Sequence, residues 1–218
     1  MNPPNRHPGA LIVVEGIDGA GSTTQSTMLI EWLVAVGIPA VATSEPSKGP
    51  IGATIRDHLA RRIELGGPEA EALAFAADRM GHVVSEIVPE LERGTTVVTD
   101  RYYLSSLAYQ ALGCDLAWLR GINRFALRPD LTVFLTVPAD VGMDRLSGRE
   151  TRERFEEDRR ELGRIAEMYD AAIELLAGDG EVVHIVDGTR SPAQIHAEIL
   201  ALATPVLERR YPGVALPR

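Results

Sequence analysis

LIVVEGIDGAGSTT, residues 11–24, is the stretch of sequence that decides the fold. Its first part, Leu11 to Gly16, is an apolar run rich in β-branched residues, which predicts a buried strand. Its second part is a glycine-rich turn that leads into a helical pattern. A strand that enters a G-x-x-x-x-G turn and then a helix brings backbone N–H groups together at the positive end of a helix dipole. The stretch therefore predicts a phosphate-binding loop.

The loop lacks the basic side chain that its pattern usually has. Such loops read G-x-x-x-x-G-K-[ST], and Gly16, Gly21 and Thr23 are in register, but Ser22 stands at the lysine position. Losing a preorganised charge of this kind costs about 3 to 4 kcal/mol, or about 10² to 10³ in rate. We therefore expect another cation to take its place. Thr23 occupies the hydroxyl position that binds Mg²⁺.

The composition is that of an ordinary globular protein. The chain has 218 residues, 45% of them apolar and 24% charged, and it has no apolar run that approaches the ~20 residues of a membrane span. A net charge of −9 argues against a protein that coats nucleic acid or a membrane surface. The single cysteine suits a reducing compartment, so we expect a cytoplasmic protein. We predict one domain over residues 11–210, with a flexible tail at 1–10 and another at 211–218.

Apolar strands alternate with helical patterns along the whole chain, which is typical of a parallel sheet wrapped by helices. The fold class that we predict is therefore α/β, a doubly wound five-stranded parallel sheet with flanking helices. The strands are expected at 11–16, 39–44, 95–100, 131–137 and 181–187. After the helix that follows the loop, helices are expected at 51–62, 68–91, 102–111, 140–146, 153–176 and 191–209, with a kink or an end at Pro89.

Charged residues follow several of these strands. In an open α/β sheet, ligands bind beyond the carboxyl ends of the strands, where this chain has Asp18, Glu45, Asp100 and Arg101. Asp100, at the end of the third strand, is where a carboxylate that orients a metal or acts as a base is expected.

Six segments then resemble the thymidylate kinase family of P-loop nucleoside monophosphate kinases, in order and in spacing. They are VVEGIDGAGSTTQ (13–25), SEPSKGPIGATIR (44–56), LAFAADRMGHV (73–83), DRYYLSSLAYQ (100–110), PDLTVFLTVP (129–138) and VDGTRSP (186–192). The resemblance covers roughly residues 11–199. It implies a kinase that transfers the γ-phosphoryl group of ATP to dTMP with Mg²⁺, and a homodimer formed through helices that flank the sheet.

The resemblance also implies roles for residues on the acceptor side. Phe75 would stack on the pyrimidine, Arg79 one helical turn later would address the acceptor phosphate or the base, and Arg101 would bind the same phosphate. From residue type alone, the commoner interpretation makes Phe75 a core residue and Arg79 a surface ion-pair partner of Asp78. The full predicted acceptor site is Glu45, Lys48, Arg56, Phe75, Arg79, Arg101, Ser105, Ser106, Tyr109 and Gln110.

On the donor side, the predicted ATP and phosphate ligands lie in the loop and in one arginine beyond it. They are Gly16, Ile17, Asp18, Gly19, Ala20, Gly21, Ser22, Thr23, Thr24 and Arg145. The predicted metal ligands are Thr23 and Asp100. Asp18 resembles a family carboxylate near the acceptor sugar and the transferring phosphate, although a loop aspartate is more often a turn former.

The segment DRLSGRETRERFEED, residues 144–158, resembles the mobile lid that closes over ATP, which we place at about 145–156. Its arginines otherwise read as a solvated helix face. We hypothesise that Arg149 or Arg152 fills the place of the missing lysine and acts in catalysis with Asp18, Asp100 and Arg101. Lys48, the only lysine, is a second candidate, but it more readily compensates for Ser44, where many relatives have arginine. Thr136, where relatives often have aspartate, has no assigned effect.

Two other functions fit the same residues. One is a kinase for another pyrimidine nucleotide or a deoxynucleoside. The other is a catalytically weakened protein that binds nucleotides for interaction or sensing, for which the missing lysine is the main argument. The two apparent substrate sites argue against a pure binder.

Overall fold

The computed structural model describes residues 2–146 and 152–217, with the side chains of residues 152–158 left out. Its centre is a five-stranded sheet in which every pair of neighbouring strands is parallel, in the order β2-β3-β1-β4-β5. The strands are β1 (Leu11–Gly16), β2 (Ala40–Ser44), β3 (Thr96–Asp100), β4 (Leu131–Thr136) and β5 (Val183–Asp187). This confirms the predicted α/β fold with a doubly wound parallel sheet.

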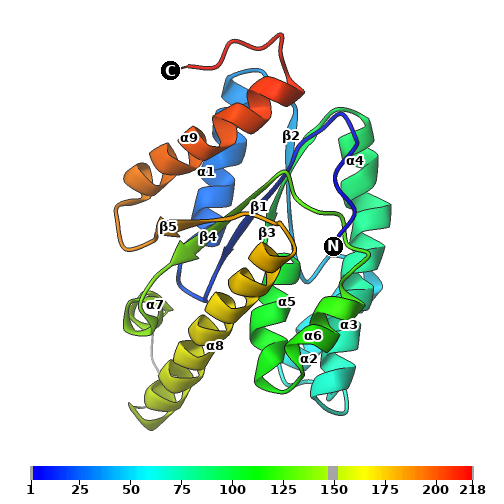
Figure 1. Cartoon of the computed structure of the whole chain (residues 1–218). Coiled ribbons are helices and arrows are strands. Elements are labelled where there is room, and N and C mark those ends of the chain that lie inside the picture. The colour runs from blue at the N-terminus through cyan, green and yellow to red at the C-terminus, as the bar shows by residue number, and fades with distance from the viewer. Residues whose placement is uncertain (1, 147–151, 218) are drawn as a thin grey trace.

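Helices cover both faces of the sheet (Figure 1). α1 (Ser22–Ala35) and α9 (Pro192–Arg210) pack together on one face. α5 (Tyr103–Tyr109) and α8 (Arg152–Gly178) pack together on the other, with α3 (Pro68–His82) beside α5. All six residues of β1 are buried, because this central strand has helices on both sides.

The remaining helices fill the connections around these layers. They are α2 (Pro50–Leu59), the π-helix η1 (Val83–Ile87), α4 (Val88–Glu92), the 3-10 helix η2 (Gln110–Leu112), α6 (Leu116–Ile122) and α7 (Ala139–Leu146). The helix predicted at 68–91 is thus three segments. Pro89 has no N–H to donate and its ring crowds the preceding turn, which accounts for the wide π-turn just before it. The short helix α6 was not predicted.

Both ends of the described chain make defined contacts with the domain, although we expected tails there. Asn2 is buried, and Pro4 pairs with Arg128 in an isolated bridge. At the other end, the Tyr211 hydroxyl donates to the Gly94 carbonyl oxygen at 3.0 Å, and Val214 packs against the core. Within the described ranges, no helix combines the length and the apolar character needed to cross a membrane.

Candidate active site

The phosphate loop lies between β1 and α1, as its sequence predicts. Gly19 has a φ of +80° and Gly21, the N-cap of α1, a φ of +99°, and both values favour glycine. A Cβ on Gly19 would lie 2.2 Å from the carbonyl oxygen of Gly142, so α7 presses closely on the loop. Ser22 begins α1 and is buried. The backbone shape of a phosphate loop is therefore present without lysine.

The two predicted metal ligands meet beside this loop. The Thr23 hydroxyl donates to Oδ2 of Asp100 at 2.5 Å, while Oδ1 of Asp100 is buried and has no hydrogen-bond partner. A hydroxyl and a carboxylate with a spare oxygen are hard oxygen donors of the kind that Mg²⁺ prefers. Mg²⁺ is usually bound by one or two protein groups together with phosphates. The described residues contain no cluster of three or more His, Cys, Asp or Glu.

Arg145, at the end of α7, contacts the loop directly. Its guanidinium donates to the carbonyl oxygens of Gly19 at 3.2 Å and Ala20 at 3.4 Å, and to that of Gly188 at 2.9 Å. It ties the loop to the turn after β5 and brings a positive charge next to it. Direct binding of ATP by Arg145 stays a prediction.

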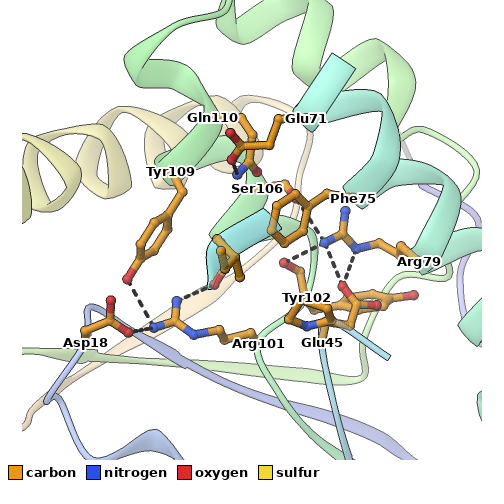
Figure 2. A pocket seen from close by; sticks show the side chains of 13 residues that line it. Asp18, Glu45, Glu71, Phe75, Arg79, Arg101, Tyr102, Ser106, Tyr109 and Gln110 are labelled. Atoms are coloured by element: carbon orange, nitrogen blue, oxygen red, sulfur yellow. Dashed lines mark hydrogen bonds and ion pairs between the residues drawn. The ribbon is translucent and has the colours of Figure 1, made fainter. Parts of the chain in front are cut away.

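A cavity of about 210 Å³ opens beside the loop, on the side of α3 and α5. Figure 2 shows its side chains, with the guanidinium of Arg101 beside Asp18 and Tyr109, and that of Arg79 beside Glu45. The lining residues are Asp18, Glu45, Pro46, Leu59, Glu71, Phe75, Arg79, Arg101, Tyr102, Ser105, Ser106, Tyr109 and Gln110. Eight of the ten predicted acceptor residues are among them.

Arg79 lines an enclosed part of the cavity wall. It is only 1% exposed, and its guanidinium forms an ion pair with Glu45, in which Nη2 and Oε2 are 2.6 Å apart. It also donates to the Asn123 side chain, to the Tyr102 carbonyl oxygen and to the Ser106 hydroxyl. Arg79 is therefore not the surface partner of Asp78 that residue type alone allowed. Asp78 instead accepts from the backbone N–H and the hydroxyl of Ser47.

Arg101 lies between the cavity and the phosphate loop. Its Nη2 donates to Oδ1 of Asp18 at 2.6 Å and to the Tyr109 hydroxyl at 3.1 Å. The guanidinium carbon also lies 4.9 Å from the centre of the Tyr109 ring, so the aromatic face adds a cation–π contact. Asp18 is 55% exposed at its side chain, which leaves room for a ligand next to this pair. A guanidinium in this position is suited to bind an anionic oxygen at the boundary between the two sites.

The polar face predicted on α5 lines the same cavity, but its groups already have partners. The Ser105 hydroxyl bonds Glu15 and Tyr169, and the Ser106 hydroxyl accepts from Arg79. The amide nitrogen of Gln110 donates to Oε1 of Glu71 at 3.2 Å.

The side-chain oxygen of Gln110, Oε1, is buried and has no hydrogen-bond partner. Phe75 is half-buried against the cavity and does not belong to the hydrophobic core, so the core interpretation of this residue is wrong.

Two predicted acceptor residues, Lys48 and Arg56, do not line the cavity. Lys48 is exposed in the loop after β2. The Arg56 guanidinium donates to the carbonyl oxygens of Pro46, at 3.0 Å, and of Ser47, so it supports the turn that carries Pro46. Ser44 and Thr136 are exposed at the ends of their strands. The structure gives no separate reason for either of these two departures from the family pattern.

The predicted lid falls largely outside what the structure describes. α7 ends at Leu146 and α8 begins at Arg152. Arg149 lies outside the described residues, and the side chain of Arg152 is likewise not described. Their roles stay predictions.

Glu15, Glu71, Tyr102 and Tyr169 belong to the site, although none was predicted. Glu15 is fully buried in β1, and burial raises its pKa from 4.5 to about 7, against the lowering effects of its hydrogen bonds and of Arg101. A charged residue inside the apolar run LIVVEG was the signal that could have revealed it. Tyr169 comes from α8, far along the chain, and no local pattern links it to the site.

Comparisons with known proteins point to one family. The family model described as "Thymidylate kinase" matches residues 14–199. The chain is 41% identical over 211 residues to the "Probable thymidylate kinase" of Thermococcus onnurineus (strain NA1), covering 91% of this chain and 99% of that protein. It is 39% identical to the "Thymidylate kinase" of Leifsonia xyli subsp. xyli (strain CTCB07) and 41% identical to that of Thermomicrobium roseum (strain ATCC 27502 / DSM 5159 / P-2). In both cases the match covers 91% of this chain and 96% of the relative.

Proposed function

The chain belongs to the thymidylate kinase family, and from this premise we propose that it transfers the γ-phosphoryl group of ATP to dTMP with a phosphate loop that has no lysine. The observation that carries the proposal is the position of Arg101. Arg101 lies between the phosphate loop and the cavity. It donates to Asp18 of the loop and to the Tyr109 hydroxyl in the cavity wall. An acceptor phosphate bound in the cavity would lie on one side of the Arg101 guanidinium, with the donor phosphates on the other side.

The cavity contacts support a pyrimidine monophosphate as acceptor. Phe75 offers an aromatic face for stacking. The unpartnered side-chain oxygen of Gln110, Oε1, needs a hydrogen-bond donor, which the N3–H of thymine or uracil provides. Arg79 can only donate, and it suits a carbonyl oxygen on the same base. Tyr109 closes the wall near the sugar.

Thr23 and Asp100 are the residues that would hold Mg²⁺. The ion supplies charge neutralisation on the donor phosphates when bound. The acceptor phosphate is already largely ionised, so Asp100 has no proton to remove. Asp18 orients Arg101 through its 2.6 Å ion pair. Catalysis then consists of positioning and electrostatic stabilisation by these side chains.

We further propose that Arg149 or Arg152 stands in for the missing lysine when the lid closes. The position of Arg145 supports this, because its contacts with Gly19 and Ala20 anchor the beginning of the lid to the loop. Arg149→Ala and Arg152→Ala should each be assayed for phosphoryl transfer and for nucleotide binding. Loss of turnover with retained binding in either variant supports the proposal, and unchanged turnover in both contradicts it.

An assay of ADP release tests the function itself. ATP and Mg²⁺ are supplied with dTMP, dUMP, UMP, dCMP or thymidine, and the kcat/KM values are compared. We expect dTMP to be the best acceptor. A preference for another acceptor would identify a different pyrimidine kinase, and no turnover with any of them would favour a nucleotide-binding protein that has lost catalysis.

We also propose a cytoplasmic homodimer, as the family resemblance implies. The exposed apolar residues Leu73 on α3, Val84 on η1 and Phe125 after α6 support an interface on these helices, being 50%, 67% and 61% exposed. Sedimentation of the purified protein tests it, and a monomer at micromolar concentration would contradict it.

A further inference from the structure

Glu15 is a charged residue that has no role in the phosphoryl transfer proposed above. It is the only charged residue of β1, it is 0% exposed, and it directly precedes the phosphate loop. An ionised carboxylate in such a place is costly unless several donors satisfy it. Its partners show what it supports.

All its strong hydrogen bonds reach the segment that carries Arg101. Oε1 of Glu15 accepts from the backbone N–H of Tyr102 at 2.8 Å and from that of Ser105 at 3.2 Å. Oε2 accepts from the Ser105 hydroxyl at 2.5 Å and more weakly from the Tyr169 hydroxyl at 3.4 Å. One buried side chain therefore fixes the first turn of α5.

The backbone of Arg101 is strained. Its φ is +69°, in the left-handed region, which is costly for a residue with a long side chain unless its neighbours hold it there. The Arg101 N–H donates to the Val14 carbonyl oxygen at 3.0 Å, and the next N–H, of Tyr102, donates to Glu15. Adjacent residues of β1 thus hold the strained residue from both sides.

The side chains also form a series of hydrogen bonds in which each donor and acceptor is fixed. Nη1 of Arg101 donates to the Ser105 hydroxyl at 3.2 Å, and this hydroxyl donates to Glu15. A guanidinium can only donate and an ionised carboxylate can only accept, so the hydroxyl has a single orientation. A proton on Glu15 would remove this constraint and the attraction between the carboxylate and Arg101.

We propose that Glu15 is a positioning residue whose carboxylate holds the strained turn at Arg101 and so aims this guanidinium at the acceptor phosphate. The inference rests on the proposed function. The titratable groups that face Glu15 are Arg101, from the turn after β3, and Tyr169, from α8; Asp18 and Tyr109 lie beyond Arg101. Because burial raises the pKa of Glu15 to about 7, proton uptake near neutral pH weakens this hold.

The test compares Glu15→Gln with wild type. Glutamine keeps an oxygen for the two backbone N–H groups and removes the charge. At about pH 8 we expect the KM for dTMP to rise about tenfold, as for the loss of one charged hydrogen bond, and the KM for ATP to stay within about twofold. The ratio of variant to wild-type KM for dTMP should fall towards one below about pH 7, where wild-type Glu15 is itself protonated. The second ionisation of the acceptor phosphate, near pKa 6, affects both proteins and cancels in the ratio.

Glu181→Gln is the matched control. Glu181 is also buried and bonded, to Tyr103 and Arg120, but does not line the cavity, so its variant should change neither KM nor the pH dependence. An unchanged KM for dTMP in Glu15→Gln, or equal rises for dTMP and ATP, would overturn the inference.

If Glu15→Gln does not fold, Ser105→Ala decides the question, because it removes only the linking hydroxyl and should also raise the KM for dTMP; an unchanged KM would overturn the inference. A wild type without turnover would contradict the proposed function instead, and calorimetric binding of dTMP to the same variants would then test Glu15.

Discussion

Position 22 is where this chain departs furthest from the usual phosphate loop. Ser22 starts α1, and the left-handed glycines at 19 and 21 give the loop its shape without help from a long side chain. What is missing is a charge. Arg145 places one beside the loop, but on its carbonyl oxygens. In our proposal, the cation aimed at the phosphates comes from the lid arginines.

The variant Ser22→Lys tests whether another cation already occupies the position of the missing lysine. We expect kcat to change by less than about threefold, because a lid arginine would already supply the charge. In an Arg149→Ala or Arg152→Ala background that has lost turnover, the same lysine should restore it. A rise in kcat of about 10² to 10³ in the otherwise wild-type chain would show instead that no cation occupies this position. Steady-state ADP release with saturating dTMP provides the comparison.

Glu71 holds the side-chain amide of Gln110 in one orientation. A carboxylate accepts only, so Glu71 binds the amide nitrogen of Gln110 and leaves the unpartnered oxygen for an N–H of the base. Thymine has N3–H at this edge, whereas N3 of cytosine is an acceptor. In Glu71→Gln the amide of Gln110 can turn over. We expect the ratio of kcat/KM for dTMP over dCMP to fall about tenfold, as for one exchanged hydrogen bond.

Glu69→Gln is the control for that change, since Glu69 lies in the exposed first turn of the same helix. It should leave the ratio of dTMP to dCMP unchanged. Equal ratios in Glu71→Gln and wild type would mean that the amide of Gln110 is held by something other than Glu71.

At the scale of elements, the sequence predicted the strands better than the helices. β1 has the predicted bounds, and each of the other four strands begins or ends within two residues of its prediction. Buried strands here are short apolar runs bounded by turns, a pattern that depends on few neighbours. The long helix predicted at 68–91 was harder, because the π-turn before Pro89 is a local response to the missing N–H rather than a change in apolar pattern. α6 is too short for its periodicity to stand out.

The site divides in the same way. Residues of the two motifs that follow β1 and β3 could be predicted, because a parallel sheet brings its strand ends together. Arg56 shows the limit: its position in a resembling segment placed it in the predicted acceptor site, but no sequence pattern indicated that its guanidinium donates to carbonyl oxygens of the turn after β2. The supporting groups, Glu71 on α3 and Tyr169 on α8, reach the site only through tertiary packing.

The close contact between α7 and the phosphate loop gives an element-scale prediction. A Cβ on Gly142 would lie 2.7 Å from the carbonyl oxygen of Asp18, which is backbone and cannot move away freely. We expect Gly142→Ala to displace the loop and raise the KM for ATP about tenfold, although alanine favours the helix by about 0.5–1 kcal/mol. Gly163→Ala in α8 is the control, because nothing lies within 4 Å of the added Cβ. It should stabilise the protein slightly and leave the KM for ATP unchanged.

For the whole molecule, the buried charge at Glu15 links global stability to pH. Its pKa is 4.5 in the unfolded reference and about 7 in the folded protein, so between these values the folded state holds a proton that the unfolded state has lost. The free energy of unfolding therefore falls as pH rises through this window, by about 3 kcal/mol in total, and is constant above it. His196 acts in the opposite direction, because burial lowers its pKa below 6.5 and the folded state gains stability as pH rises.

The difference between Glu15→Gln and wild type isolates the Glu15 contribution, since His196 is common to both. Buried tyrosines do not interfere, because burial raises the pKa values of Tyr102, Tyr109 and Tyr169. In urea unfolding, we expect the free energy of unfolding of Glu15→Gln to rise relative to that of wild type as the pH rises from about 4.5 to about 7. The difference should then stay constant to about pH 8. A difference independent of pH would mean that Glu15 keeps an ordinary pKa. The ionised carboxylate would then not lower the free energy of unfolding, and Glu15 would not lose its effect on the position of Arg101 at neutral pH.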